Sequence, residues 1–410
     1  MRLPVCTRWE ADVEQFEFDR CVNREGLATI KELYAPKILK EKGLVNYWGA
    51  EFEFPTCPAF RRGVRKCAEN GLFGFTAQTD AYNEKVCWWL EHVRGVKIDP
   101  TWIVPTHGTI FALATAIRLC LREAADYMIV LLPGYNRYEQ AARRMGKKTV
   151  FSNLLFDGES YEVDWEDLSA KMKDPAAKLL VVCNPNNPTG TILKAEELQR
   201  IAKLAKENGV TVFSDEIFAE IGLEKGTAVV PCMAAVCGAD APVLSVVSLG
   251  KCMSLTGVNH ANALIQNEAL RERYMEQKYA DHYGSLDPML YAGLMEAYSP
   301  EGKAFVEALN KVIAQNAAAM TEAVERLVPG AKVIRPEGTY VLWIDYHKTG
   351  LTADALAAFL NEEAFFVGDT GEDYGTDGLF YRYNLAVPPA EIGKSMRMLE
   401  RAAAERGWIR

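Results

Sequence analysis

The stretch VVCNPNNPTG, residues 181–190, joins an apolar run to a loop that contains three asparagines and two prolines. Proline fixes the backbone and removes a hydrogen-bond donor, while asparagine supplies a short amide that can bond to a group held in front of it. A loop constrained in this way usually grips a ligand or a neighbouring segment. We therefore expect a buried strand here that ends at a binding site.

On both sides of this loop, from about residue 51 to residue 287, short apolar runs alternate with helical patterns. The runs are TWIVPT (101–106), DYMIVLLP (126–133), KLLVVC (178–183), VTVFSD (210–215) and VLSVVSL (243–249), with helices expected from Thr109 and over Ala195–Asn208. Near-continuous apolar strands separated by helices are typical of a mostly parallel sheet that is covered on both faces. The sequence thus predicts an α/β fold.

The C-terminal part shows a different pattern. An alanine-rich amphipathic helix is expected over 302–327, followed by VIRPEGTYVLWIDY (333–346), a helix over 353–362, LFYRYNLAVP (379–388) and a last helix over 390–405. This mixture predicts a smaller α+β domain. We expect a large α/β domain over 46–287 and a small domain made of 1–45 and 288–410, packed closely because no low-complexity linker separates them.

The composition excludes several classes of protein. The chain has 410 residues, 49% of them hydrophobic and 25% charged, with a net charge of -9, which is typical of a soluble globular protein that handles small molecules rather than nucleic acid. No membrane span or signal peptide fits, so we expect a cytoplasmic protein. Ten cysteines without a C-x-x-C spacing are interpreted as reduced, and five histidines never fall at metal-ligand spacing, so no metal site is expected.

Two charged residues stand where predicted strands end. Lys251 comes shortly after VLSVVSL, and Asp215 closes VTVFSD with Glu216 beside it. A turn lysine facing solvent and a helix-capping aspartate are the ordinary interpretations. Because the carboxyl ends of strands form the ligand crevice of open α/β sheets, a cofactor that carries positive charge is the alternative. A carboxylate facing a pyridine nitrogen would keep it protonated, and a protonated ring accepts electrons from a neighbouring carbanion.

Anion-binding candidates accompany them. Gly108 and Thr109 open a helix after an apolar run, and the free N–H groups of a helix N-terminus suit a phosphate, although a threonine cap is equally consistent. Ser248 could add a hydroxyl to the same anion. Arg382 lies in an aromatic strand, where its guanidinium needs a carboxylate, either from a ligand or from an Asp or Glu of the protein.

Taken together, these motifs resemble a known family. NPNNPTG, SDEI, the S-x-x-K from Ser248 to Lys251 and YRYNLAVP are similar to the fold-type I, class I aminotransferase-like enzymes that use pyridoxal 5′-phosphate. The resemblance covers most of the chain. Further stretches resemble the cystathionine beta-lyase-like branch, which includes maltose-regulon modulators and other carbon-sulfur lyases: NYWGAEFEFPTCPAF (46–60), ENGLFGFT (69–76), WIVPTHGTIFALATAI (102–117) and LLPGYNRYEQ (131–140).

The resemblance implies a role for each matching residue. Lys251 would bond covalently to the cofactor aldehyde and then carry protons, Asp215 would pair with the pyridinium, and Asn187 would bond to the phenolic oxygen of the ring. Asn184 and Asn186 would hold the turn. The remaining roles are stacking on the ring by Tyr135, binding of the phosphate by Gly108, Thr109 and Ser248, and binding of the substrate carboxylate by Arg382.

The resemblance also implies a reaction class and an assembly. Either transamination or loss of a β-thiolate, with pyruvate and ammonia as further products, is expected for an amino acid substrate. A regulatory or interaction protein that keeps the fold is the alternative. A homodimer is implied, with residues 73–79 reaching the partner subunit.

Three positions depart from the family pattern. Phe218 stands where relatives place a tyrosine or histidine that donates to the phenolic oxygen, Phe75 where many have a tyrosine that reaches the partner's phosphate, and Asn259 where many aminotransferases have an arginine. Without the donor at position 218, we expect the nitrogen that joins Lys251 to the cofactor to lose its proton at a higher pH than in relatives.

Overall fold

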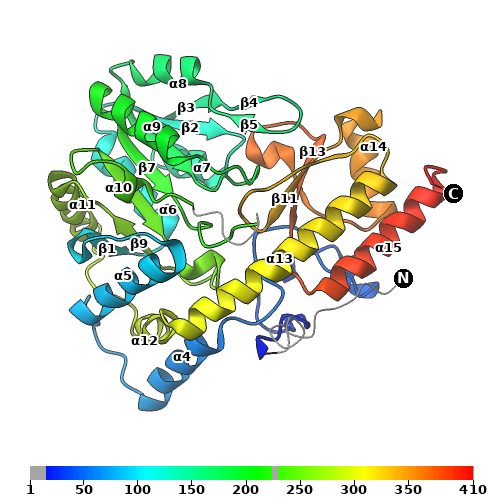
Figure 1. Cartoon of the computed structure of the whole chain (residues 1–410), viewed down its shortest axis with the longest axis horizontal. Helices are drawn as coiled ribbons and strands as arrows, with labels where there is room; N and C mark the ends of the chain where they lie inside the picture. Colours follow the sequence, from blue (N-terminus) through cyan, green and yellow to red (C-terminus); the bar gives the residue numbers. More distant parts are fainter. Residues whose placement is uncertain (1–14, 224–229, 410) are drawn as a thin grey trace.

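The computed structural model describes residues 15–223 and 230–409, and its centre is a seven-stranded sheet (Figure 1). The strand order is β1-β9-β8-β7-β6-β2-β3. Only β9 runs against its neighbours β8 and β1, and the pairs from β8 to β3 are parallel. The strands are β1 (Ile103–Thr106), β2 (Tyr127–Leu132), β3 (Lys148–Asn153), β6 (Ala177–Cys183), β7 (Thr211–Asp215), β8 (Val243–Val247) and β9 (Ala261–Leu264). The predicted α/β class with a mostly parallel sheet is confirmed.

The sheet is buried on both faces because successive side chains of a strand point to opposite sides. Met128 and Val130 of β2 enter one apolar cluster, and Ile129 and Leu131 enter another on the opposite face. Helices cover these faces: α6 (Thr109–Cys120), α7 (Arg137–Arg144) and α11 (Glu268–Ala280) lie with the first cluster, and α8 (Trp165–Met172), α9 (Ala195–Asn208) and α10 (Met233–Val236) with the second.

A second sheet of four strands has the order β10-β11-β13-β12 (Figure 1). Its strands are β10 (Lys332–Ile334), β11 (Val341–Asp345), β12 (Asp369–Thr370) and β13 (Phe380–Asn384). Beside it run α13 (Pro300–Leu327), α14 (Ala353–Ala358) and α15 (Pro389–Glu405). The helix expected over 353–362 is α-helical only as far as Ala358 and continues as a π-helical turn, Phe359–Glu363.

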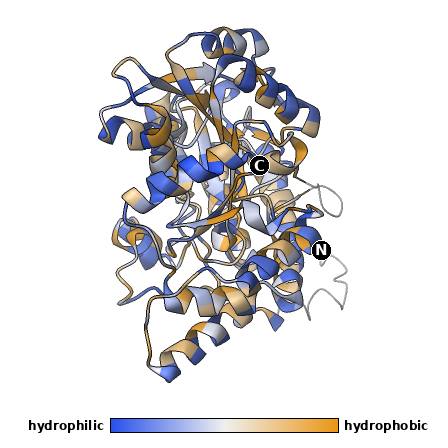
Figure 2. Ribbon diagram, turned by 90° about the vertical axis from the view of Figure 1, so that its left-hand side faces the viewer, coloured by the Kyte–Doolittle hydropathy of each residue, from blue (hydrophilic) through white to orange (hydrophobic). Residues whose placement is uncertain are grey.

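The remaining elements connect these layers. They are α2 (Ile30–Leu33), α3 (Lys37–Glu41), α4 (Pro58–Asn70), α5 (Asp80–Arg94), α12 (Pro288–Ala297), the hairpin of β4 (Leu155–Phe156) and β5 (Tyr161–Glu162), and the 3₁₀ turns Pro100–Trp102, Leu249–Lys251, His347–Thr349 and Gly371–Tyr374. Figure 2 shows polar residues on the outer faces of the helices and apolar residues along the strands inside. The domain boundaries proposed above stay a prediction, and their segment 1–14 lies outside the described residues.

The composition led to two expectations, one about the cysteines and one about membrane-spanning helices. The nine cysteines in the described ranges are free thiols, whereas Cys6 falls outside these ranges. Within residues 15–223 and 230–409, no helix combines the length and apolarity that crossing a membrane requires.

Candidate active site

The carboxyl ends of the parallel strands open into one cavity of about 650 Å³. This position is where open α/β sheets place their ligands, because the loops after neighbouring strands converge there. The residues predicted for catalysis, cofactor binding and substrate binding all line this cavity: Gly108, Thr109, Tyr135, Asn187, Asp215, Ser248, Lys251 and Arg382. Side chains separated by more than 270 positions are thus brought together by the seven-stranded sheet and by strand β13 of the four-stranded sheet.

Lys251 ends a 3₁₀ turn directly after β8, and the Ser248 hydroxyl caps this turn by accepting from the Gly250 N–H at 3.0 Å. The Nζ of Lys251 donates to the carbonyl of Ala50 at 2.9 Å, and the hydroxyl of Tyr340 donates to the same oxygen at 2.9 Å. Burial, reinforced by the charge of Arg382, lowers the pKa of Lys251 to about 8. Near neutral pH a tenth or so of this amine is therefore uncharged and able to accept a proton.

Asp215 is the last residue of β7 and is buried. It caps no helix, because the residues that follow form turns, and its Oδ1 accepts from the Ile217 N–H at 3.2 Å. The hydroxyl of Tyr138 donates to Oδ2 at 2.6 Å. Burial raises the pKa of Asp215 to about 6 although these hydrogen bonds oppose the shift. Asp215 is thus a buried carboxylate that is mainly ionised above pH 6 and borders the cavity.

The neighbouring Glu216 serves a different purpose. Its carboxylate is fully buried, bonds to the Arg94 guanidinium at 2.8 Å and accepts from the Met233 N–H at 2.9 Å. A buried charge needs such a partner. Glu216 therefore belongs to the structural core, and Asp215 alone of the two lines the cavity.

The N-terminus of α6 forms another wall. Its N-cap is Gly108, with φ 91° and no side-chain cap, so the first N–H groups of the helix are not satisfied by a capping oxygen. Ser248 lies beside it, but its hydroxyl donates to the His260 carbonyl at 2.7 Å. Ser248 would have to rotate before it could donate to an anion, which weakens its predicted contribution to phosphate binding.

His260 also lines this wall and is buried. Its Nε2 lies 3.0 Å from the Tyr82 hydroxyl, which donates to Asn262 Oδ1 at 2.8 Å. His260 Nδ1 has no hydrogen-bond partner among the described residues. Burial, with the charge of His107, lowers the pKa of His260 to about 3, so the ring is neutral at physiological pH.

Arg382 faces both a carboxylate of the protein and the asparagine loop. Its Nε and Nη2 donate to Asp369 Oδ2 at 3.0 and 2.7 Å, across the directly paired strands β12 and β13, and its Nη1 donates to Asn187 Oδ1 at 2.8 Å. The structural partner considered for Arg382 is therefore present. A guanidinium carries five N–H donors, so two remain for a ligand.

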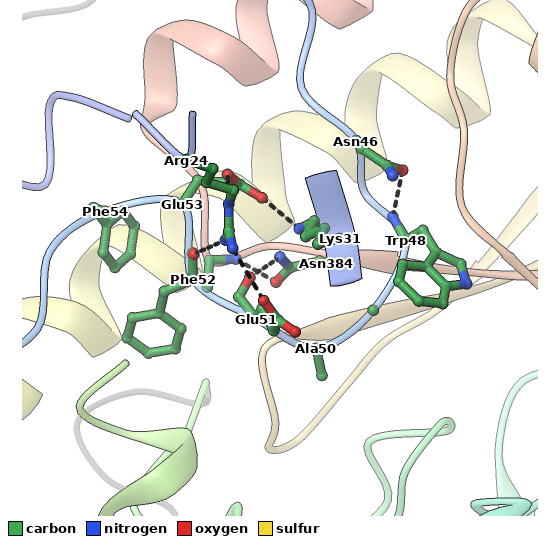
Figure 3. Close-up of polar contacts among 12 residues, drawn as sticks. Arg24, Lys31, Asn46, Trp48, Ala50, Glu51, Phe52, Glu53, Phe54 and Asn384 are labelled. Carbon is green, nitrogen blue, oxygen red and sulfur yellow. Dashed lines mark hydrogen bonds and ion pairs between the residues drawn. The ribbon is translucent and has the colours of Figure 1, made fainter. Parts of the chain in front are cut away.

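The loop over 46–54 holds the carbonyl that Lys251 contacts, and Arg24 and Lys31 bind acidic residues of this loop (Figure 3). Arg24 contacts Glu51 at 3.1 Å and Glu53 at 3.3 Å, and Lys31 contacts Glu53 at 2.5 Å. The Asp369 carboxylate accepts from the Gly49 N–H at 3.2 Å. The loop over 46–54 therefore contacts Asp369, the partner of Arg382, on one side of the cavity and Lys251 on the other.

Sequence reasoning missed several of these contributors. Ala50 and Tyr138 lie within the family-like stretches 46–60 and 131–140 but were not singled out there, and Asp369 and Tyr340 lie in no stretch that was assigned to the site. Tyr138 stands three residues after Tyr135 and so shares its side of the helix start, which is the one local signal that could have found it.

The three departures from the family pattern lie in different places. Phe218 is buried and lines the cavity, with its ring centroid 5.7 Å from Lys251 Nζ and 5.2 Å from the Tyr340 ring. Asn259 lines the cavity next to Gly108. Phe75 is fully exposed and lies outside the cavity lining.

Comparisons with known proteins agree with this architecture. The sequence profile described as Aminotransferase class I and II matches residues 51–395. Cystathionine beta-lyase PatB of Bacillus subtilis is 25% identical over 94% of this chain and 99% of that protein, and Protein MalY of Escherichia coli is 23% identical over 93% and 97%. Cystalysin from Treponema denticola, whose crystal structure contains pyridoxal 5′-phosphate, superposes with a TM-score of 0.86 at 25% identity, covering 95% of this chain and 99% of that one.

Fold and comparisons together define a pyridoxal 5′-phosphate-dependent enzyme of fold-type I. The chain belongs to the class I and II aminotransferase family, and within it the cystathionine beta-lyase-like branch. The names of these relatives support an enzyme that acts on amino acids, as aminotransferase or carbon-sulfur lyase, rather than the alternative of a regulatory protein. The residues of the cavity fit the cofactor, because a lysine amine, a buried carboxylate and a free helix N-terminus match its aldehyde, ring nitrogen and phosphate.

Proposed function

We propose that this chain is a carbon-sulfur β-lyase that cleaves an L-amino acid carrying a thioether or thiol on its β-carbon. The observation that supports this choice most is the near full-length likeness to a cystathionine beta-lyase, combined with one cavity that contains all the matching residues. Transamination is the competing reaction, since the same residues serve both.

The proposed roles of the cofactor-facing residues rest on the family resemblance, and their contacts support them. Lys251 would attach the cofactor, Asp215 would face the ring nitrogen, and Tyr135 would cover one face of the ring. The Oδ1 of Asn187 is used by Arg382, which leaves the amide N–H groups of Asn187 to donate to the phenolic oxygen. Arg382 therefore fixes which end of this amide points toward the ring.

The phosphate would lie at the N-terminus of α6. Backbone N–H groups near Gly108 and Thr109 and the positive end of the helix favour an anion there. Because Asn259 carries no charge and the Ser248 proton is donated to the His260 carbonyl, this helix end would carry most of the charge compensation.

The substrate carboxylate would be bound by Arg382. Its two remaining N–H groups can form a charge-assisted pair with a carboxylate, while Asp369 holds the guanidinium plane. This pair would fix the α-hydrogen of the substrate relative to Lys251.

Once the amine of the substrate has displaced it from the cofactor, the Lys251 amine would act as the base. The bound cofactor supplies a protonated ring that stabilises negative charge at the substrate α-carbon. With a pKa of about 8, the Lys251 amine has an uncharged fraction that takes the α-proton, and the Ala50 carbonyl orients it. Departure of the β-thiolate then breaks the carbon–sulfur bond, and water releases pyruvate and ammonia.

The test is a product assay on purified protein loaded with pyridoxal 5′-phosphate. Cystathionine should yield pyruvate, ammonia and a free thiol in equal amounts, and Lys251→Ala should abolish all of them together with the borohydride-sensitive visible band. A keto acid formed from an amino donor only when a second keto acid is added, without thiol release, would assign transamination instead.

We also propose a cytoplasmic homodimer. In support, Leu72 and Phe73 are 73% and 56% exposed and Phe75 is fully exposed, in the loop after α4 where the family resemblance places contacts with a partner subunit. Exposed apolar clusters usually mark interaction surfaces. Sedimentation of the wild type should give a dimer, and Phe75→Asp should shift the population toward monomer.

A further inference from the structure

Tyr138 lies in the first turn of α7 and has a buried hydroxyl whose partner is the Asp215 carboxylate, at 2.6 Å. Its ring also packs edge-on against Tyr135, with centroids 5.6 Å apart and planes at 90°. One side chain thus contacts both the residue proposed to cover the cofactor ring and the residue proposed to face the ring nitrogen.

The surroundings of Asp215 offer few other groups that could stabilise its charge. From β6 the Cys183 thiol faces it, and burial raises the pKa of this thiol to about 12, so the thiol is neutral. From the turn after β8 comes the Lys251 amine, and Glu216 adds a like charge from the same strand end. Tyr135 is the further titratable neighbour, also neutral because burial raises its pKa. The Tyr138 hydroxyl is therefore the nearest side-chain donor recorded for this carboxylate.

We propose that Tyr138 is a positioning residue that holds Asp215 ionised and turned toward the ring nitrogen of the cofactor. This inference rests on the proposed function. It requires the hydroxyl and not the ring: phenylalanine would keep the contact with Tyr135 and the apolar packing of α7, and would leave the carboxylate with the Ile217 N–H. A hydrogen bond to a charged group favours the charged form, so its loss raises the pH above which Asp215 is ionised.

The experiment measures the affinity of cofactor-free protein for pyridoxal 5′-phosphate between pH 5 and 8.5, by equilibrium titration of the visible band. Wild-type affinity should fall below about pH 6, where Asp215 becomes protonated. Tyr138→Phe should move this midpoint upward by about one pH unit, so that binding is about fivefold weaker at pH 6 and nearly equal to wild type above pH 8.

Two further variants separate this role from packing. In Asp215→Asn the decline at low pH should disappear, and adding Tyr138→Phe should not bring it back. Tyr127→Phe is the matched control, because its buried ring also loses one hydroxyl contact, at 3.2 Å to the Lys171 carbonyl, at the opposite end of β2. Its pH curve should superimpose on wild type.

The outcomes distinguish a failure of the proposed function from a failure of the positioning role of Tyr138. If wild-type protein binds no pyridoxal 5′-phosphate, the proposed function itself fails. If wild type binds but Tyr138→Phe gives the same curve, or is weaker by the same factor at every pH, the positioning role is refuted while the proposed function stands.

Discussion

Arg382→Lys is the sharpest test of how the substrate would be held. Arg382 uses three of its five N–H groups on Asp369 and Asn187, which leaves two for a substrate carboxylate. Lysine keeps the positive charge but replaces the planar fork by a point charge on a flexible stem. The variant therefore separates charge from geometry at a position that is 3% exposed.

The expected magnitude follows from the lost hydrogen bonds. Each charge-assisted bond contributes about 1.5–3 kcal/mol, and an ammonium that still satisfies Asp369 can replace at most one of the two substrate contacts. A net loss of about 3 kcal/mol corresponds to roughly a 100-fold fall in kcat/KM for the amino acid substrate. Because Asn187 also loses its partner, its amide can turn, and a small change in the visible band should accompany the fall.

Steady-state kinetics of wild type and variant, both saturated with cofactor, check this value. Arg406→Lys is the matched control, since Arg406 makes a similar pair with Glu363, at 2.7 Å from Nε, away from the cavity. Its kcat/KM should equal that of wild type. A kcat/KM of Arg382→Lys within threefold of wild type would refute carboxylate recognition by this fork.

Three further predictions address cofactor chemistry and stability. Phe218→Tyr places a hydroxyl beside Lys251 and should lower the pH at which the visible band titrates by about one unit, measured by spectrophotometric titration; an unchanged titration would exclude a missing donor at this position. The rate at which added pyridoxal 5′-phosphate forms the visible band should rise with pH from about 6, as Asp215 ionises, and level off above about 8, as the Lys251 amine becomes uncharged; a rate that falls over this range would contradict both assignments. Arg94→Met leaves Glu216 as an unpaired buried charge and should lower the free energy of unfolding by about 3–5 kcal/mol, measured in denaturant melts. The double variant Arg94→Met with Glu216→Leu removes both charges and should recover part of this loss.

The local pattern of the sequence was sufficient to predict the helices and strands and many of the residues that line the cavity. Apolar runs such as 178–183 are long enough to require burial on both faces, so the strands could be predicted from them. Lys251 and Asp215 each have an ordinary interpretation when taken alone, and the resemblance of the ordered motifs to a family is what selected them, together with Asn187, as site residues. Their functional roles remain predictions.

Contacts between distant segments could not be predicted in the same way. Asp369 meets Arg382 because two short strands pair, and Ala50 meets Lys251 because a loop from the N-terminal part lines the cavity. Tyr138 meets Asp215 because α7, which packs against β2 and β3, places this side chain within reach of the end of β7. Periodicity reports which residues are buried but not which partner they find, since hydrogen bonds are short and directional and depend on the exact register of the packed elements. The sequence by itself therefore determined the sheet, the family and the residues whose side chains can take part in the chemistry. The tertiary structure decided which hydrogen-bond donors hold these side chains in place.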